Sequence, residues 1–285
     1  MHPSTRTAPD AGKTRRALLT LFAACVLPLA LAGGVGAATD APATDAPALV
    51  RVGVVPGPDV EILEQVRKVA AGRGLKIELI QFSDYIIPNQ ALANGEIEAN
   101  AFQHQPYLQA QTASTGWKLV KAGETITSPM ALYSTRHKSL DAIPAGGSIA
   151  IPNDPTNGGR ALRLLADRGL FRLKDGETVA ATVRDISDNP KKLKIIELDA
   201  AQIARSLPDV DAAAINSNYA VEAGLDPVKG GLAREDSNGP WVNIIAVRAA
   251  DAGKPWVSAL VGAYRSDEIR QFILERYKGV YIPAW

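Results

Sequence analysis

Apolar residues along the chain follow two alternating spacings, which predict strands and helices in turn. A β-branched run over 49–55 (LVRVGVV) predicts a strand that ends at a Pro-Gly-Pro turn. From Asp59 onward apolar residues recur every three or four positions, which predicts an amphipathic helix that ends near Gly72 and Gly74. Residues 75–82 (LKIELIQF) then alternate as a second strand. A strand–helix–strand unit of this kind favours parallel strands joined by a right-handed crossover.

The same order of elements returns in the second half of the chain. A strand is predicted over 148–151, followed by the polar loop 153–159 and a helix that ends near Gly169. Further strands are predicted over the apolar runs at 194–198, 212–215 and 242–247. Two helices close the chain. The pattern therefore predicts an α/β protein with two lobes, each a mostly parallel sheet flanked by helices.

The first 38 residues have the pattern of an export signal. Basic residues precede an apolar run over 17–32, and the small residues at 33–38 provide a cleavage site. The run is short for a membrane-spanning helix and contains a proline. Residues 39–48 (TDAPATDAPA) have nothing to bury and are interpreted as a linker. We therefore expect a signal peptide over 1–38, a linker, and export to the periplasm.

The export route and the anchoring are both left open by this segment. The adjacent Arg15 and Arg16 fit either twin-arginine or general secretion. The stretch Phe22-Ala23-Ala24-Cys25 resembles a lipobox, which makes Cys25 a candidate lipid attachment site. A lipid on Cys25 would tether the protein to the membrane. The alternative is a small apolar residue within the signal, because apolar residues continue past the cysteine.

Composition removes the sequence support for several classes of protein. The formal net charge is +1, so no strong field favours nucleic acid. A single cysteine excludes an intramolecular disulfide, and the three histidines lack the spacing of a zinc motif. The chain has no P-loop, nucleophile elbow or dinucleotide-binding glycine motif. We expect no enzyme, no metal and no cofactor; an exported two-lobed α/β protein of this kind is typical of solute binding.

Ring-bearing residues gather between the second strand and position 107, although only 6% of the chain is aromatic. They are Tyr85, Phe102, His104 and Tyr107. Rings paired face to face would form a slot for an apolar or thioether side chain, because sulfur is polarizable and favours ring contacts. An aromatic core cluster is the alternative. His104 has no Ser, Cys or metal-ligand partner, so we interpret it as pocket wall and not as a catalytic group.

Polar residues that are candidates for ligand binding follow the later predicted strands. The segment 153–160 (NDPTNGGR) leads into a helix whose free N–H groups and dipole attract an anion. Arg160 is predicted in the first turn, where a cation opposes the dipole, so binding of a carboxylate would explain it; a surface arginine is the alternative. Asn216 and Asn243 suit a zwitterion, since an amide accepts from an ammonium and donates to a carboxylate. A turn residue is the alternative for each.

Five segments together resemble the methionine-binding lipoprotein family of the NlpA/MetQ type, whose members are substrate-binding proteins of methionine ABC importers. The segments are FSDYIIPNQAL, ANAFQHQPYL, IPNDPTNGGRAL, LDAAQIARSLPDVDAAAINSNYA and PWVN. The resemblance runs in order over nearly all of residues 49–285, and FQHQPY together with NDPTNGGR is specific. The sequence departs from the family pattern at Ser217 and Asn218, where two threonines are usual, and in its weak lipobox.

The resemblance implies a type 2 periplasmic-binding-protein fold, in which two hinged lobes close on one L-methionine in the cleft between them. It assigns the side-chain slot to Tyr85, Phe102, His104 and Tyr107. It assigns the ligand carboxylate to Arg160, with Asn157 beside it, and the amino-acid head group to Asn216 and Asn243. It also implies a membrane permease with a paired ATPase as partners. We further expect a monomer that does not bind nucleic acid.

The lobes and the ligand are predicted as follows. The chain is expected to cross between lobes near 128–133 and to return near 244–248. One lobe then comprises 49–128 and 247–285, and the other 129–246.

D-methionine or a methionine-containing dipeptide remains an alternative ligand. Two other classes of protein are alternatives to a solute-binding protein. A secreted hydrolase would turn over a substrate, and a surface interaction module would need no ligand cleft.

Overall fold

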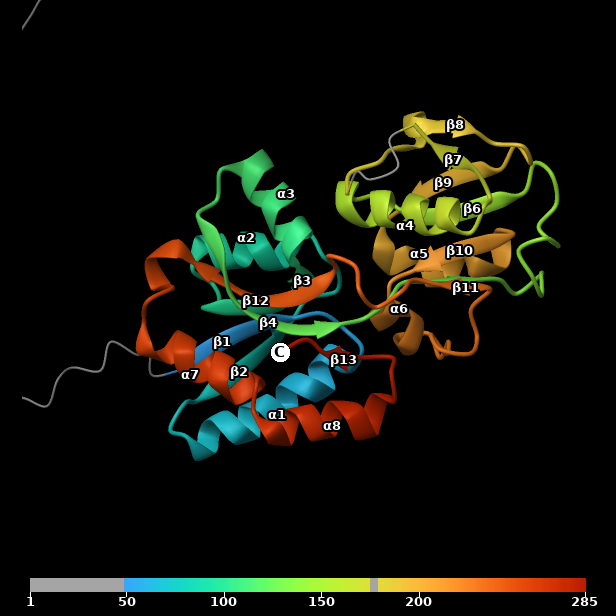
Figure 1. Cartoon of the computed structure of the whole chain (residues 1–285). Coiled ribbons are helices and arrows are strands. Elements are labelled where there is room, and N and C mark those ends of the chain that lie inside the picture. Colours follow the sequence, from blue (N-terminus) through green and yellow to red (C-terminus); the bar gives the residue numbers. More distant parts are fainter. Residues whose placement is uncertain (1–48, 175–178) are drawn as a thin grey trace, which may run out of the picture. The chain divides into compact units, whose positions relative to one another are not determined.

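Two large β-sheets flanked by helices make up most of the part of the chain that the structure describes, residues 49–174 and 179–285 (Figure 1). The structure is a computed structural model. The predicted signal peptide, the linker and Cys25 lie outside the described residues. Both sheets belong to one compact unit of the chain.

The six-stranded sheet has the order β13-β4-β12-β3-β1-β2. Its strands are β1 (Val50–Val54), β2 (Ile77–Gln81), β3 (Ala99–His104), β4 (Leu119–Thr127), β12 (Val242–Arg248) and β13 (Ile282–Pro283). Strand β1 is parallel to β2 and β3, as the first strand–helix–strand unit predicts. Strand β12 is antiparallel to both β3 and β4, so β3 and β4 run in the same direction.

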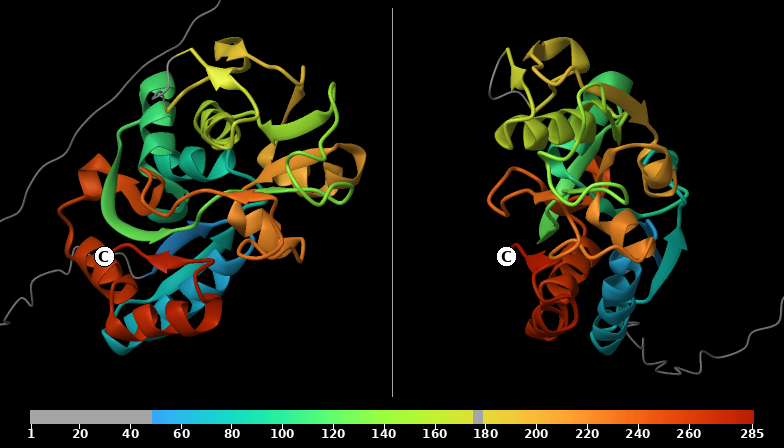
Figure 2. Two further views of the ribbon diagram at one scale, coloured as in Figure 1. Left: turned by 45° about the vertical axis from the view of Figure 1, so that its right-hand side comes forward. Right: turned by 90° about the vertical axis from the view of Figure 1, so that its right-hand side faces the viewer.

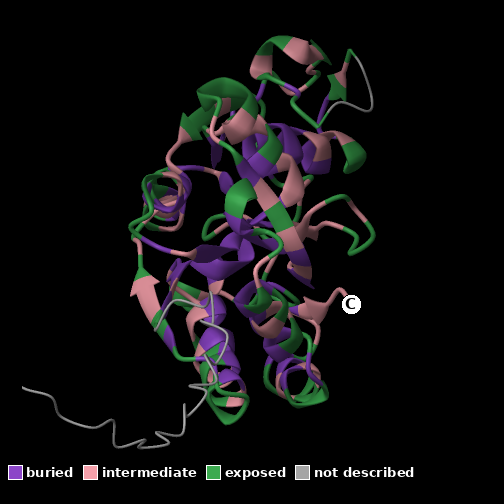
Figure 3. Ribbon diagram, turned by 90° about the vertical axis from the view of Figure 1, so that its left-hand side faces the viewer, coloured by how far each residue is buried: buried purple, intermediate pink, exposed green. Residues whose placement is uncertain are grey.

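Helices cover both faces of this sheet (Figure 1). One face carries α1 (Pro58–Gly72), α7 (Pro255–Tyr264) and α8 (Asp267–Tyr277), and the other carries α2 (Ile87–Asn94) and α3 (Gln105–Thr115). The alternating Val50, Val52 and Val54 pack in the core under α1, because successive side chains of a strand point to opposite faces. Figure 3 shows buried residues along the inward sides of the helices and exposed ones outside.

The five-stranded sheet has the order β11-β5-β10-β6-β9. Its strands are β5 (Ala131–Tyr133), β6 (Ser148–Pro152), β9 (Lys194–Leu198), β10 (Ala212–Ile215) and β11 (Ala233–Arg234). Strands β9, β6 and β10 are parallel, and β5 is antiparallel to β10. Helix α4 (Pro155–Asp167) covers one face, and α5 (Ala200–Ser206) and α6 (Ser217–Glu222) cover the other.

Short elements complete the described part of the chain. The strands β7 (Arg172–Leu173) and β8 (Ile186–Asp188) pair with each other, and the 3₁₀ turns are Val183–Asp185, Leu207–Asp209 and Ala249–Asp251. Within residues 49–174 and 179–285, no helix is both long and apolar enough to cross a membrane.

Within the described residues, the chain passes between the two large sheets twice. The first passage lies between Thr127, where β4 ends, and Ala131, where β5 begins; Figure 2 shows this green connection from two further sides. The return lies between Arg234 and Val242, upstream of the predicted 244–248, because the whole of β12 pairs within the six-stranded sheet. An apolar run reveals a strand but not the sheet that it joins. The lobe boundaries themselves stay a prediction.

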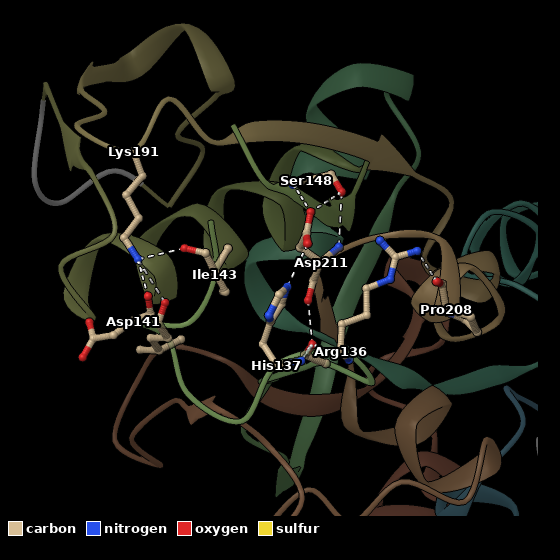
Figure 4. Close-up of polar contacts among 10 residues, drawn as sticks. Arg136, His137, Asp141, Ile143, Ser148, Lys191, Pro208 and Asp211 are labelled. Carbon is tan, nitrogen blue, oxygen red and sulfur yellow. Dashed lines mark hydrogen bonds and ion pairs between the residues drawn. The ribbon is translucent and has the colours of Figure 1, made fainter. Parts of the chain in front are cut away.

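A polar cluster fastens the connection between β5 and β6 to the five-stranded sheet (Figure 4). His137 Nε2 lies 2.8 Å from Asp211 Oδ1, and Asp211 Oδ2 accepts hydrogen bonds from the backbone and hydroxyl of Ser148. The hydrogen bond with His137 lowers the pKa of Asp211. Lys191 Nζ donates to the carbonyl of Ile143, 2.9 Å away. This cluster is structural and lies outside the pocket described next.

Candidate functional site

A pocket is lined by residues from both sheets and their helices. All eight residues predicted to bind a ligand line it, namely Tyr85, Phe102, His104, Tyr107, Asn157, Arg160, Asn216 and Asn243. Five residues that sequence reasoning missed also line it, namely Asp59, Gln103, Ser128, Asn218 and Tyr281. A larger groove beside α1 and α8 contains none of the eight. The residues predicted to bind a ligand therefore converge on one pocket.

The aromatic wall of the pocket is formed by Tyr85, Phe102 and Tyr107. The Tyr85 and Phe102 rings are tilted by 36° with centroids 5.8 Å apart, and Phe102 meets Tyr107 edge to face at 6.0 Å. The prediction of rings paired face to face is therefore wrong. Aromatic rings prefer tilted and edge-to-face contacts, because the edge of one ring carries positive charge and the face of the next negative charge. The wall is nonetheless apolar, as a thioether slot requires.

Strand β3 directs Phe102 and His104 into this pocket. The two residues are separated by one position and therefore point to the same side of the strand. Behind them, three buried amides hold the strand: Asn89 Nδ2 donates to Gln103 Oε1 over 2.8 Å, and Gln103 Nε2 donates to Asn100 Oδ1 over 2.9 Å. Buried amides that are paired in this way fix the register of β3 against α2.

His104 is a neutral, hydrogen-bonded residue of the pocket. Its Nδ1 accepts a hydrogen bond from the backbone N–H of Tyr107 over 3.1 Å and thereby caps α3. The proton is therefore on Nε2, which lies 3.3 Å from Asn157 Oδ1. Burial, together with the nearby charge of Arg160, lowers the pKa of His104 to about 3. The imidazole is thus uncharged at neutral pH.

Asp154 occupies the N–H groups at the start of α4. Its Oδ1 accepts from the backbone of Thr156 and Asn157 over 3.2 and 2.8 Å, so the prediction that these groups are free to hold an anion is wrong. An aspartate before the first turn is a preferred cap of this kind. Asp154 Oδ2 also accepts from Asn157 Nδ2, 3.0 Å away. The cap therefore orients Asn157 toward the pocket.

The side-chain amide of Asn216 makes a hydrogen bond through its nitrogen but not through its oxygen. Its Nδ2 donates to Asn157 Oδ1 over 2.9 Å. Its Oδ1 is buried and has no hydrogen-bond partner among the described residues. A buried acceptor without a partner is rare in native proteins and calls for a ligand or water. Asn243, on β12 opposite His104, makes no side-chain hydrogen bond to the described residues.

Arg160 lies in the second turn of α4, because the helix begins at Pro155 directly after its cap. The predicted first-turn position is therefore wrong. The guanidinium is 4% exposed and forms an ion pair with Glu235, with Nη2 to Oε2 at 2.7 Å. Nη2 also donates to the carbonyl of Ser128 over 3.0 Å, and the Trp241 ring lies 5.1 Å from Cζ. Nη1 hydrogen-bonds to none of the described residues.

Asp59 brings a carboxyl group to the pocket. Tyr281 donates its hydroxyl to Asp59 Oδ2 over 3.1 Å, and burial raises the pKa of Asp59 to about 7. The two residues are 222 positions apart, so no local pattern could have revealed the pair. Nearby, Tyr85 donates to Asn218 Oδ1 over 2.6 Å and links α6 to the aromatic wall.

The described part of the chain contains no candidate metal site. Among residues 49–174 and 179–285, no group of three His, Cys, Asp or Glu side chains is placed to hold a metal ion. The pocket is lined by rings, amides, a paired guanidinium and the carboxyl group of Asp59. Such groups bind and orient a small molecule.

Comparison with known proteins identifies the family of this chain. A family profile described as NlpA lipoprotein matches residues 50–285. The chain belongs to the NlpA lipoprotein family. The D-methionine-binding lipoprotein MetQ of Escherichia coli (strain K12) is 45% identical over 239 residues, which are 83% of this chain and 88% of that protein. The family resemblance predicted from the sequence is confirmed.

Two solved structures of relatives have the same architecture as this NlpA-family protein. A nutrient-binding protein from Burkholderia cenocepacia bound to methionine is 50% identical with a TM-score of 0.81, covering 83% of this chain and all of that one. A periplasmic substrate-binding protein of an ABC transporter from Coxiella burnetii is 47% identical with a TM-score of 0.80, covering 82% of this chain and 100% of that one. The predicted periplasmic-binding-protein fold is confirmed.

Proposed function

We propose that this protein binds methionine in the pocket between its two sheets and delivers it to the permease of an ABC importer. The observation that carries the proposal is the convergence on one pocket of all eight residues predicted to bind the ligand, which comprise aromatic rings, a neutral histidine, amides and one arginine. The relatives named above include a methionine complex, a MetQ lipoprotein and a transporter binding protein. The role is binding, and no residue is assigned to catalysis.

Each end of the ligand has a matching set of groups. The thioether would lie against Tyr85, Phe102 and Tyr107, because polarizable sulfur favours ring contacts. The ligand carboxylate would accept from Nη1 of Arg160, the guanidinium nitrogen that the described residues leave unbonded. The ammonium would donate to the unpartnered Oδ1 of Asn216, and Asn243 would complete the head-group site.

The stereochemistry of the ligand is part of the proposal. We favour L-methionine, with D-methionine as the alternative that the name of the Escherichia coli relative favours. In both cases the partners would be a permease and its ATPase. The binding protein would act as a monomer in the periplasm, tethered through Cys25 if that residue is lipidated.

Mass spectrometry of the gently purified mature protein tests the proposal first. Spectra of the native and then the denatured protein should release about one methionine per chain. Calorimetry of protein freed from ligand should then rank L-methionine, D-methionine and a methionine dipeptide. Arg160→Ala should weaken methionine binding by roughly 2–5 kcal/mol, because it removes the charge partner of a buried carboxylate. An empty native protein that also binds none of the three ligands would refute the proposal.

A further inference from the structure

Glu235 holds the guanidinium of Arg160 from the side opposite the free nitrogen. Nε of Arg160 lies 2.9 Å from each oxygen of Glu235, and Nη2 lies 2.7 Å from Oε2. The two side chains are only 4% and 11% exposed. A two-point contact between a planar guanidinium and a carboxylate fixes both position and rotation. Glu235 therefore decides where Nη1 points, although it does not line the pocket itself.

The same pair is tied to the segment that joins the two sheets. Glu235 Oε2 accepts from the backbone N–H of Met130 over 2.8 Å, and Arg160 Nη2 donates to the carbonyl of Ser128 over 3.0 Å. Between them, the carbonyl of Pro129 accepts from the hydroxyl of Ser217 over 2.6 Å. Residues 128–130 follow β4 of one sheet and precede β5 of the other. The ion pair thus connects the ligand site to the first passage between the sheets.

Trp241 supports the guanidinium on its face. The indole lies 5.1 Å from Cζ of Arg160 and 5.0 Å from the ring of His104. Cations placed over an indole face are attracted by the negative electrostatic potential of that face. Arg160 is therefore held at two edges by Glu235 and Ser128 and on one face by Trp241. Nη1 is the nitrogen left for a ligand.

We propose that Glu235 is a positioning residue for ligand binding, which presents Nη1 of Arg160 to the carboxylate of the ligand and couples that contact to residues 128–130. The inference rests on the proposed function. Because Glu235 neutralises Arg160 and occupies its Nε and Nη2, the ligand carboxylate binds through one nitrogen of an ion pair that has no net charge. The arrangement favours a zwitterion, whose own net charge is zero, over an anion of the same shape.

A double-mutant cycle tests whether Glu235 acts through Arg160. Methionine dissociation constants are measured by calorimetry, or by ligand-observed NMR where binding is weak, for the wild type, Glu235→Gln, Arg160→Ala and the double variant. Glu235→Gln keeps the size of the side chain and should weaken binding at least about tenfold in the wild-type background. In the Arg160→Ala background it should change binding less than about twofold. The matched control is Asp236→Asn, an equal charge change on an exposed neighbour, which should bind as the wild type does.

Two results would overturn the inference. Wild-type affinity in Glu235→Gln would show that Arg160 needs no positioning, and an equal loss in both backgrounds would show that Glu235 acts without Arg160. Thermal melts check that each variant is folded. If the Glu235→Gln variant does not fold, Glu235→Asp takes its place, because it withdraws the carboxylate by one methylene. A wild-type protein that binds no methionine would instead refute the proposed function, and the cycle would then use the molecule released from the native protein.

Discussion

His104 on β3 and Asn157 on α4 meet across the pocket, with Nε2 of the imidazole 3.3 Å from Oδ1 of the amide. The tautomer that makes this contact is fixed by Tyr107, whose backbone N–H donates to Nδ1. One side chain thus caps a helix beside the six-stranded sheet and reaches a helix on the five-stranded sheet. The cap on α3 requires a neutral imidazole, because only an unprotonated Nδ1 can accept from Tyr107, and burial keeps the imidazole neutral.

His104 should make the folded protein sensitive to acid. Its folded pKa, about 3, lies below the unfolded value near 6.5, so its stabilising contribution is complete above about pH 6.5 and is lost as the pH falls toward 3. The contribution of His104 to the free energy of unfolding should fall by about 1.4 kcal/mol per pH unit in that window. His104→Asn, which can still cap α3, should remove this slope. Urea unfolding at several pH values would measure it, and an unchanged slope would refute the assignment.

Asp59 should have the opposite effect. Its pKa of about 7 in the folded protein lies above the unfolded value near 4, so stability is complete below about pH 4 and is lost as the pH rises through 7. Asp59→Asn should therefore stabilise the protein at pH 8, by at most about 4 kcal/mol, and much less at pH 4. The wild type should show a nearly flat profile between about pH 4 and 6.5, because the contributions of His104 and Asp59 offset each other. Equal stability of Asp59→Asn and wild type at pH 8 would contradict this.

Asp154→Ala should affect both stability and binding. Loss of the cap of α4 should cost about 1 kcal/mol of unfolding free energy. Binding of methionine should also weaken, because Asn157 Nδ2 loses its carboxylate partner. The matched control is Asp199→Ala, which removes the cap of α5 outside the pocket and should cost stability alone. Thermal melts and calorimetry on both variants give the comparison; equal methionine affinities would mean that the cap does not orient Asn157.

Gly159 should not tolerate a side chain. A Cβ at this position would lie 2.8 Å from the backbone nitrogen of Ala181 and from the carbonyl oxygen of Val179. Gly159→Ala should therefore destabilise the protein by about 1–3 kcal/mol. Gly72→Ala is the matched control, since its Cβ would meet no atom within 4 Å and alanine favours a helix by up to about 1 kcal/mol. Chemical unfolding distinguishes them; a neutral Gly159→Ala would show that residues 179–181 move aside.

Phe102→Ala should change the ligand preference of the pocket. Phe102 is 6% exposed and contacts the rings of Tyr85 and Tyr107. Removing it should weaken methionine binding more than binding of alanine or serine, because the lost contacts are those of the thioether. Competition of each amino acid against a bound fluorescent reporter would measure the ratio. Equal losses for all three would argue against a side-chain slot at this wall.

The amino-acid sequence determined the local structure of this protein and the chemistry of its pocket. The spacing of apolar residues fixes α1, β2, α4 and β12 because helix and strand periods are local properties. All eight predicted residues line one pocket, since they lie at or shortly after strand ends that the fold brings together. The predicted first-turn position of Arg160 failed because Asp154, and not a later residue of the loop, caps the helix.

The tertiary structure alone decided the pairings that join distant parts of the chain. Glu235 lies 75 positions after Arg160, and Tyr281 lies 222 positions after Asp59. Strand β12 inserts between β3 and β4, which sets the return between the sheets upstream of its predicted place. Such contacts depend on how the passages between the sheets fold back, and no spacing within one helix or strand carries that information. The sequence therefore supplied the groups that face a ligand, and the fold supplied the partners that orient them.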